Sequence, residues 1–563
     1  MTYDHIIVGG GSAGCVLANR LSATGRSVLL IEAGPDTPPD NVPEIIYDSY
    51  PSLAYFDPRY HWRELRVCHE AYREGGAPLK LRKFEQARVM GGGSSINGQF
   101  ALRGLPGDFE EWRALGLEGW SYDDVLPFFK KLERDTDFEG PAHGREGRIP
   151  VRRVFEERWP GFTTAVHEAF KAEGYPVRED LNADFADGCF PMTVSNQYDR
   201  RVSTAVGYLD SATRRRPNLR ILADTVVTGL EMEDRKVTGV RASLPGGAEK
   251  RFEAGEVILS AGAAHSPALL MRAGIGPADH LTSLGVAVTA DLPGVGGNLL
   301  EHPSISVAIH LKPEARLPEG RRRHIFMGLR YSSHLGDCPQ GDMFLLPVNR
   351  AGWHPLGKQL GTFVLTVHKS YSQGLLRLKS DSPADEPIVA MNLASDPRDL
   401  RRLMDGMRFM QRLLAQPALK CAINFWFPAG YSDRVRALAI PTLRNYLATG
   451  AAAQLIGLSA WTRDLVYRKK LNPGVDCDRL GRDDDYLAQW IADNVWPSWH
   501  ISGTCRMGRR DDPAAVVDAK CRVRGISGLR VVDASVMPTI VSANTNISTI
   551  MIGEKIAAEI LAE

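Results

Sequence analysis

Three glycines near the start of the chain could bind the pyrophosphate of a dinucleotide. Gly9, Gly11 and Gly14 follow a short apolar strand and precede a helical stretch. Gly9 permits a tight turn, Gly11 lets the backbone approach a phosphate, and Gly14 lets the helix pack close to the strand. Glu32 closes the next apolar run, at the distance expected for an acid that binds a ribose hydroxyl. The spacing predicts a dinucleotide-binding turn, which would suit nicotinamide and flavin cofactors equally well.

The elements that must position this turn are apolar runs that end at small residues. A second glycine cluster covers residues 88–98, and a buried strand at 256–260 breaks at small residues before a helix. Four further segments have strand character: residues 217–222, 225–230, 237–243 and 251–259. A last buried strand, 528–533, ends in an acid and is followed by a helix from about residue 547. This order predicts a nucleotide domain to which the chain returns after insertions.

A second pattern fills residues 305–485, where no phosphate-type glycine turn occurs. Strands are expected at 362–368 and 374–379, and an amphipathic helix at 399–414. Prolines and polar residues between Asp36 and Pro58 predict a long irregular loop. We therefore expect a second domain that lacks a nucleotide turn of its own.

Length and charge limit the function classes. A chain of 563 residues is too long for one hydrophobic core. Its 68 lysines and arginines nearly cancel its 67 aspartates and glutamates, which gives no electrostatic case for nucleic acid or an anionic membrane as a partner. No leader-like segment and no apolar run long enough for a membrane span is visible, so we expect a cytoplasmic protein. The eight cysteines have no metal-like spacing, which predicts neither a metal site nor a disulfide framework.

Taken together, these segments resemble the glucose-methanol-choline family of flavoprotein oxidoreductases over nearly the full chain. The resemblance is carried by the N-terminal turn and by further motifs at residues 91–97, 262–276, 294–303, 500 and 533–546. It implies an α/β fold with a Rossmann-like FAD-binding domain assembled from discontinuous segments, and an α+β substrate-binding domain with an antiparallel sheet. The expected boundaries are 1–155, 200–304 and 490–563 for the first domain, and 156–199 and 305–489 for the second.

The resemblance also implies which residues hold the cofactor, FAD. The second glycine cluster supports this, because a buried flavin ring needs small residues and backbone donors along a second edge. In covalently flavinylated relatives a histidine of this loop is bonded to the ring, but Ile96 stands at the matching position, so we expect noncovalent FAD. The predicted cofactor-binding residues are Gly9, Gly11, Ser12, Ala13, Gly14, Glu32, Ala33, Arg88, Gly92, Gly93, Ser94, Asn97, Gly98, Val227, Ala261, Trp499, Asp533, Ala534, Asn544 and Thr545.

The implied reaction is oxidation of a primary alcohol to the aldehyde. It requires a base for the hydroxyl proton and an acceptor for the carbon-bound hydride. By resemblance His500 is the base and Asn544 orients the hydroxyl and stabilises a developing alkoxide. His302 lies in a family turn near the cofactor and receives no catalytic role.

The stretches 499–504 and 543–546 are most similar to family members that oxidise aromatic and heteroaromatic alcohols. Val367, His368 and Trp499 are predicted to line the substrate pocket, while Phe425, Trp426 and Phe427 fit a hydrophobic core better than a pocket wall. Dioxygen is the expected acceptor, with release of hydrogen peroxide. Two alternatives stay open: a choline-like dehydrogenase that uses a quinone or another acceptor, and a hydroxynitrile lyase with a bystander flavin. A flavin-binding protein without catalysis would leave His500 and Asn544 idle.

Overall fold

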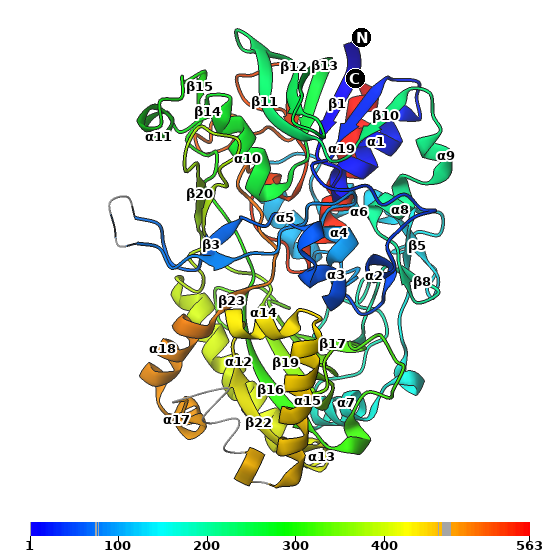
Figure 1. Ribbon diagram of the computed structural model, residues 1–563, viewed down its shortest axis with the longest axis vertical. Helices are drawn as coiled ribbons and strands as arrows, with labels where there is room; N and C mark the ends of the chain where they lie inside the picture. Colours follow the sequence, from blue (N-terminus) through cyan, green and yellow to red (C-terminus); the bar gives the residue numbers. More distant parts are fainter. Residues whose placement is uncertain (1, 74–75, 77, 460, 464–474) are drawn as a thin grey trace.

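The computed structural model describes residues 2–563 except 74–75, 77, 460 and 464–474. It contains two large sheets, stacked along the long axis of the molecule, and the chain passes between them several times (Figure 1). Both chain ends lie beside the first sheet, at the top of Figure 1. No helix in the described part of the chain is long and apolar enough to span a membrane.

The first sheet holds the dinucleotide turn. Its strands are β1 (Thr2–Val8), β2 (Val28–Ile31), β10 (Leu219–Leu222), β11 (Val226–Glu233), β12 (Lys236–Ser243), β13 (Glu249–Leu259) and β24 (Leu529–Val531). Their order is β10-β2-β1-β13-β12-β11, and β24 pairs with β13. β10, β2, β1, β13 and β24 run parallel, whereas β12 and β11 add an antiparallel extension. The parallel strands are apolar over long runs because helices and loops cover both of their faces.

Two helices far apart in the sequence cover this sheet together. α1 (Ser12–Ser22) and α19 (Thr545–Ala562) pack against each other, and α6 (Tyr122–Leu132) packs against α19. Gly553 makes the approach possible, because a Cβ there would lie 3.2 Å from the Cα of Ala13. The C-terminal helix is thereby held directly beside the N-terminal turn.

The second sheet lies below the first in Figure 1 and is antiparallel. Its strands are β7 (Gly188–Pro191), β16 (Pro303–Leu311), β17 (Met327–Tyr331), β18 (Met343–Val348), β19 (Leu360–Val367), β22 (Ile423–Ala429) and β23 (Trp496–Pro497). The order is β22-β16-β19-β18-β17-β7, with β23 paired to β16. α12 (Pro397–Ala415) packs on β19 and β16, and it begins where the Asp396 carboxylate accepts the backbone N–H of Arg398.

Shorter elements connect and flank the two sheets. The small sheets contain β3 (Arg66–Cys68), β4 (Arg82–Lys83), β5 (Glu133–Asp135), β6 (Ile149–Val151), β8 (Asn196–Gln197), β9 (Arg200–Arg201), β14 (Ile275–Gly276), β15 (Ala290–Asp291), β20 (Leu375–Arg377) and β21 (Ile388–Ala390). The remaining helices discussed in the text or shown in Figure 1 are α2 (Glu44–Tyr47), α3 (Ser52–Phe56), α4 (Gly93–Ile96), α5 (Pro106–Ala114), α7 (Gly161–Ala172), α8 (Thr204–Tyr208), α9 (Ser211–Arg214), α10 (Gly262–Arg272), α11 (Ala278–Ser283), α13 (Pro417–Ala422), α14 (Asp433–Ala439), α15 (Leu443–Leu458), α17 (Cys477–Arg482) and α18 (Asp484–Asn494).

The predicted fold class is confirmed: a Rossmann-like parallel sheet from discontinuous segments is joined to an antiparallel sheet. One detail differs from the sequence prediction. The stretch predicted as an irregular loop between Asp36 and Pro58 contains α2 and α3, because Pro43 and Pro51 each precede a single short helical turn.

The strand pairings can be compared with the predicted domain boundaries, which stay a prediction. β7, from the segment 156–199, joins the edge of the second sheet as expected. β23 pairs with β16 in the second sheet although its residues were assigned to the first domain. The chain therefore passes along the second sheet directly before it reaches His500.

Candidate functional site

One cavity of about 400 Å³ lies at the ends of β1, β2 and β13 of the first sheet. The glycine turn, β2, β11 and α10 provide one side of it, and the segments around His500 and Asn544 provide the other. This volume is typical of cofactor and substrate sites, which often lie outside the carboxyl ends of parallel strands. The dinucleotide turn and the candidate base therefore share one cavity.

The two glycine loops lie directly against each other. The Gly91 N–H donates to the Gly10 carbonyl at 2.6 Å, and a Cβ on Gly92 would lie 2.8 Å from the Cα of Gly11. Gly92 has a φ of +53°, which favours glycine. Gly93, in contrast, has no atom within 4 Å of its Cβ position, so its backbone is open to the cavity. The contact between the loops builds a wall that a cofactor backbone or ring can approach closely.

Gly9 and Gly14 must be glycine because the backbone comes very close to them. Gly9 has a φ of +102°, and a Cβ on it would lie 2.4 Å from the Ser260 carbonyl oxygen. A Cβ on Gly14 would lie 2.0 Å from the Gly9 carbonyl oxygen. These close approaches leave the N-terminus of α1 facing the cavity, where its free N–H groups favour an anion such as a pyrophosphate.

Two buried carboxylates line the same cavity and hold backbone N–H groups. Glu32 accepts from Gly10 and Gly34, each at 2.8 Å, and burial raises the pKa of its carboxyl. Asp533 accepts from the Gly262 N–H at 2.8 Å and from a Ser266 hydroxyl. Asp533 thus fixes the start of α10 and also faces the cavity. It can therefore hold the backbone and contact a cofactor at the same time.

On the other side of the cavity, His500 and Asn544 face each other. The Asn544 side-chain nitrogen lies 3.0 Å from His500 Nε2. Asn544 is the N-cap residue of α19, but its side chain makes no capping hydrogen bond and is directed at the histidine instead. The other ring nitrogen, His500 Nδ1, lies 2.9 Å from His302 Nδ1, and His302 Nε2 lies 3.0 Å from the Val541 carbonyl.

The backbone around this pair is held by two buried carboxyl groups. The Glu301 carboxyl accepts the backbone N–H of His500 at 2.9 Å and that of His302 at 2.8 Å, and burial raises its pKa to about 8. The segment before Asn544 is held by Asp108, which accepts the Ser542 N–H and hydroxyl at 2.7 and 2.8 Å.

The imidazole of His500 is surrounded by few charges. Burial lowers the pKa of His500 to about 4. At neutral pH the ring is therefore uncharged and can accept a proton. Asn544 can donate to that ring or to a substrate oxygen but cannot take up a proton.

Aromatic side chains surround the cavity beside His500. Trp499 has a φ of +60°, and its ring packs edge to face with Tyr55 and with Tyr431, each at a centroid distance of 5.1 Å. Tyr55, Phe100 and Trp499 line the cavity itself. The strained backbone at Trp499 projects a flat apolar wall next to the candidate base.

Most of the predicted cofactor residues line this cavity, and three do not. Gly14 packs inside the turn, Ser94 bonds to the Gly91 carbonyl and to Thr204, and Arg88 donates to the Ala33 carbonyl at 3.0 Å. All three support the walls from behind. Ile96 does not line the cavity either, and its side chain packs with Ile46, Ala54, Tyr60 and Val89.

Two of the predicted substrate residues lie elsewhere. Val367 and His368 are buried at the end of β19 and do not line the described cavity. The His368 ring stacks on Phe344 at 4.7 Å, and its centroid lies 5.3 Å from that of His302. The geometry places His368 behind His302, whereas Trp499 lies in the cavity wall. Phe425 and Phe427 pack against helix α15, in line with a core role.

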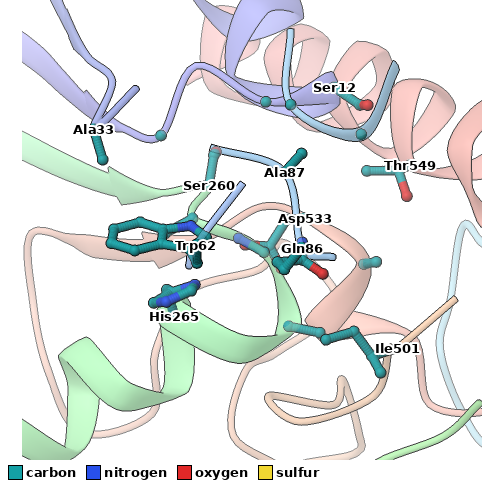
Figure 2. A pocket seen from close by; sticks show the side chains of 18 of the residues that line it. Ser12, Ala33, Trp62, Gln86, Ala87, Ser260, His265, Ile501, Asp533 and Thr549 are labelled. Carbon is teal, nitrogen blue, oxygen red and sulfur yellow. The ribbon is translucent and has the colours of Figure 1, made fainter. Parts of the chain in front are cut away.

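Several lining residues were missed by the sequence analysis. Figure 2 shows Trp62 and His265 ring to ring near Ala33, at a centroid distance of 4.2 Å, with Gln86 close by. Thr549 projects from the C-terminal helix near Ser12. Gln86 lies two residues before the second glycine cluster, which is a weak sequence signal. His265 lies within the motif at 262–276, but nothing in the sequence pairs it with Trp62.

A group of buried acids with His143 contains the ligand types of a metal site. Oxygens of Glu133 and Asp135 and a ring nitrogen of His143 lie within 4.8 Å of one another. Arg153 already contacts both Asp135 oxygens at 2.6 Å, and Arg103 pairs with Glu133. The carboxylates are thus neutralised by protein cations, which explains the arrangement without an ion.

Comparisons with known proteins cover the whole chain. Family models described as GMC oxidoreductase match residues 3–304 and 370–553. The chain is 42% identical to a 5-(hydroxymethyl)furfural oxidase from Methylovorus sp. (strain MP688), over 100% of this chain and 99% of that one. It is 32% identical to an oxygen-dependent choline dehydrogenase from Vibrio vulnificus (strain YJ016), covering 99% and 94%. The crystal structure of pyridoxine 4-oxidase from Mesorbium loti matches with a TM-score of 0.82 at 26% identity, covering both chains completely.

Proposed function

Because this chain belongs to the GMC oxidoreductase family, we propose that it oxidises a primary alcohol to the aldehyde with noncovalent FAD and dioxygen. The single observation that carries the proposal is the 3.0 Å contact between His500 Nε2 and Asn544, in the same cavity as the dinucleotide turn. One side of the cavity suits an adenosine diphosphate group, and the other offers a neutral base beside a neutral hydrogen-bond donor.

The residues present fit FAD. Gly11 and Gly93 leave open backbone where a cofactor can approach, and the N-terminus of α1 faces the same space. Noncovalent attachment is supported by Ile96, which cannot bond to a flavin and faces the core, and no cysteine is found among the described lining residues. When bound, FAD supplies the hydride acceptor, which dioxygen regenerates with release of hydrogen peroxide.

The protein's own contribution is to hold the alcohol and take its proton. The hydroxyl proton passes to His500 Nε2, while the O–H electron pair stays on oxygen. The Asn544 side-chain N–H is placed to donate to that oxygen as negative charge develops. This assignment requires a neutral His500, which its lowered pKa of about 4 provides at neutral pH.

The walls of the cavity support an aromatic or heteroaromatic alcohol. Tyr55, Phe100 and Trp499 offer flat apolar surfaces next to the base. Flat rings gain packing energy on such walls. The similarity to a protein named 5-(hydroxymethyl)furfural oxidase agrees with this substrate class.

The test is anaerobic reduction of the purified holoenzyme by furfuryl or benzyl alcohol, followed by admission of air. We expect the flavin absorbance to bleach and then to return with formation of peroxide. The His500→Ala variant should keep its flavin and lose about 100- to 10,000-fold in the rate of bleaching. The exposed His334→Ala variant is the matched control and should react like the parent.

Other outcomes of the same test separate the alternatives. Bleaching that persists in air but is discharged by a quinone dye would indicate a dehydrogenase. Cleavage of mandelonitrile without bleaching would indicate a hydroxynitrile lyase. Acid precipitation decides the attachment, because noncovalent flavin is released to the supernatant and covalent flavin stays in the pellet.

A further inference from the structure

A chain of three hydrogen bonds fixes where the protons lie behind the candidate base. It begins at the Val541 carbonyl, which can only accept. His302 Nε2 lies 3.0 Å from this oxygen, so that nitrogen carries the hydrogen. The carbonyl also accepts the Ala543 N–H at 2.8 Å, so its position is fixed by the loop that leads to Asn544.

The next link depends on the charge of His302. Its ring is buried, and burial together with the nearby rings of His500 and His368 holds its pKa well below the ordinary value. The adjacent Glu301 carboxyl accepts the backbone N–H groups of residues 302 and 500, and burial raises its pKa to about 8, so that it is mostly uncharged at pH 7. His302 is therefore neutral, and with its hydrogen on Nε2 it has a lone pair on Nδ1.

The last link then follows from geometry alone. His302 Nδ1 and His500 Nδ1 are 2.9 Å apart, and two lone pairs would repel at this distance. His500 Nδ1 must therefore carry the hydrogen. A neutral imidazole has only one N–H, so the lone pair of His500 lies on Nε2, beside the Asn544 amide.

We propose that His302 is a positioning residue that holds His500 in the tautomer with its lone pair on Nε2, the ring atom next to Asn544 in the cavity. The inference rests on the proposed function in one respect, namely that His500 is the base. The role of His302 is to accept the Nδ1–H bond of His500, which selects one of two tautomers that are close in energy for a free imidazole.

This arrangement also suits the protonated state. When the alcohol O–H bond breaks and a new N–H bond forms at His500 Nε2, the hydrogen on Nδ1 keeps its acceptor on His302. The positive charge of the ring is thus stabilised without any rearrangement behind it. His302 itself is held by the Val541 carbonyl and by the ring of His368, which in turn stacks on Phe344.

Three substitutions at one position separate the two bonds of His302. In His302→Asn, the side-chain oxygen can occupy the place of Nδ1 and still accept from His500. In His302→Gln, the amide reaches the place of Nε2 and can bond to Val541, but no acceptor stands at the place of Nδ1. His302→Leu removes both bonds.

We expect anaerobic flavin reduction to slow about 10- to 100-fold in His302→Leu and His302→Gln, and less than about 5-fold in His302→Asn. The alcohol concentration for half-maximal reduction should change little, because His302 does not line the cavity. Equal rates in all three variants, or an Asn variant as slow as the Leu variant, would overturn the proposal.

A spectroscopic measurement on the holoenzyme keeps the test independent of activity. In 15N-histidine spectra, the pattern that disappears in His500→Ala belongs to His500. We expect protonated Nδ1 in the parent and in His302→Asn, and a mixture with protonated Nε2 in His302→Leu. A parent spectrum with protonated Nε2 contradicts the inference even if no variant folds.

The two proposals fail in different ways. If His500→Ala reduces its flavin at the parental rate, the assignment of the base is wrong, while the spectrum still decides the tautomer. If His500→Ala is inactive but the parent spectrum shows protonated Nε2, His500 is still required for the reaction, whereas the role of His302 and proton transfer to Nε2 are both wrong.

Discussion

Two buried clusters in this protein contain histidine. The histidines are neutral in one cluster and protonated in the other. At the candidate site, His302 and His500 bond to each other and to neutral partners, and we call this pair the neutral histidine chain. In the other group, His143 contacts Asp180 at 2.7 Å, Asp135 at 3.1 Å and Glu133 at 3.5 Å, and we call it the charged cluster.

The difference comes from the neighbours, since both groups are removed from bulk water. Burial alone lowers the pKa of His500 to about 4. In the charged cluster the same penalty is outweighed by three carboxylates, which raise the pKa of His143 to about 10. Burial disfavours the charged ring unless an opposite charge is close by. The ring that must accept a proton therefore has neutral partners at both nitrogens, and the ring that holds segments together has carboxylates at both.

The charged cluster joins segments that are distant in the sequence. Arg153 pairs with Asp135 at 2.6 Å and with Asp180 at 3.2 Å, and both His143 and Arg153 are buried. Removing one member leaves the opposite charge buried without a partner, which costs far more than losing an exposed ion pair. The cluster should thus matter for stability and not for the reaction.

The largest expected effect is from the Asp135→Asn substitution. It removes a carboxylate from between Arg153 and His143, and we expect a loss of about 3–5 kcal/mol in the free energy of unfolding. The matched control is Asp405→Asn, which breaks the exposed Arg401–Asp405 pair at 2.9 Å and should cost less than about 1 kcal/mol. Urea unfolding measures both, and a similar loss for the two variants would contradict the assignment of a structural role to the cluster. Activity per bound flavin should stay at the parental value in both.

The second prediction turns the neutral chain into a charged pair. In Asn544→Asp, a carboxylate would stand about 3 Å from His500 Nε2 and raise the pKa of the ring, so that it is protonated at pH 7. Anaerobic flavin reduction should slow by about 100-fold at that pH and recover as the pH rises through the new pKa. Asn544→Ala controls for the lost amide, and we expect a smaller decrease, about 10-fold, without this rise. Identical pH profiles for the two variants would show that charge at this position does not control the base.

Local patterns in the sequence predicted the turn, because its requirements are local. Gly9 and Gly14 are needed for close contacts within a few residues or with the adjacent strand, so their spacing alone carries the signal. Glu32 comes directly after β2, so its distance from the glycines carries the signal as well. The parallel and antiparallel sheets were likewise predictable from the order of these motifs and from the family resemblance.

The histidine chain was not predictable in this way. His302 and His500 are 198 residues apart, and their contact arises only where β23 pairs with β16. His500 and Asn544 were proposed through the resemblance, since fourteen histidines occur in the chain and no pattern distinguishes this one. His368 was predicted to line the substrate pocket from a strand, but it directly follows β19 and lies outside the cavity, because its surroundings depend on Phe344 and His302 from other segments.

The last effect, at most about 1.4 kcal/mol per pH unit for each group, is a pair of opposite pH dependences of stability. His143 has a pKa of about 10 in the folded protein and about 6.5 in the unfolded chain. Its stabilisation is complete below pH 6.5 and is lost as the pH rises toward 10. His324 is buried beside Tyr50, at a centroid distance of 4.8 Å, and its pKa is about 3. Its neutral form stabilises the fold above pH 6.5, and this contribution is lost as the pH falls toward 3.

Matched glutamine substitutions measure how much each histidine changes the unfolding free energy with pH. For one proton this change is limited to about 1.4 kcal/mol per pH unit. The difference in unfolding free energy between the parent and His143→Gln should be largest near pH 6 and shrink as the pH rises to 9. The difference between the parent and His324→Gln should shrink as the pH falls from 7 to 5. Urea unfolding at each pH gives both slopes. If they had the same sign, the neighbouring charges would not determine which buried histidine of this protein carries a proton.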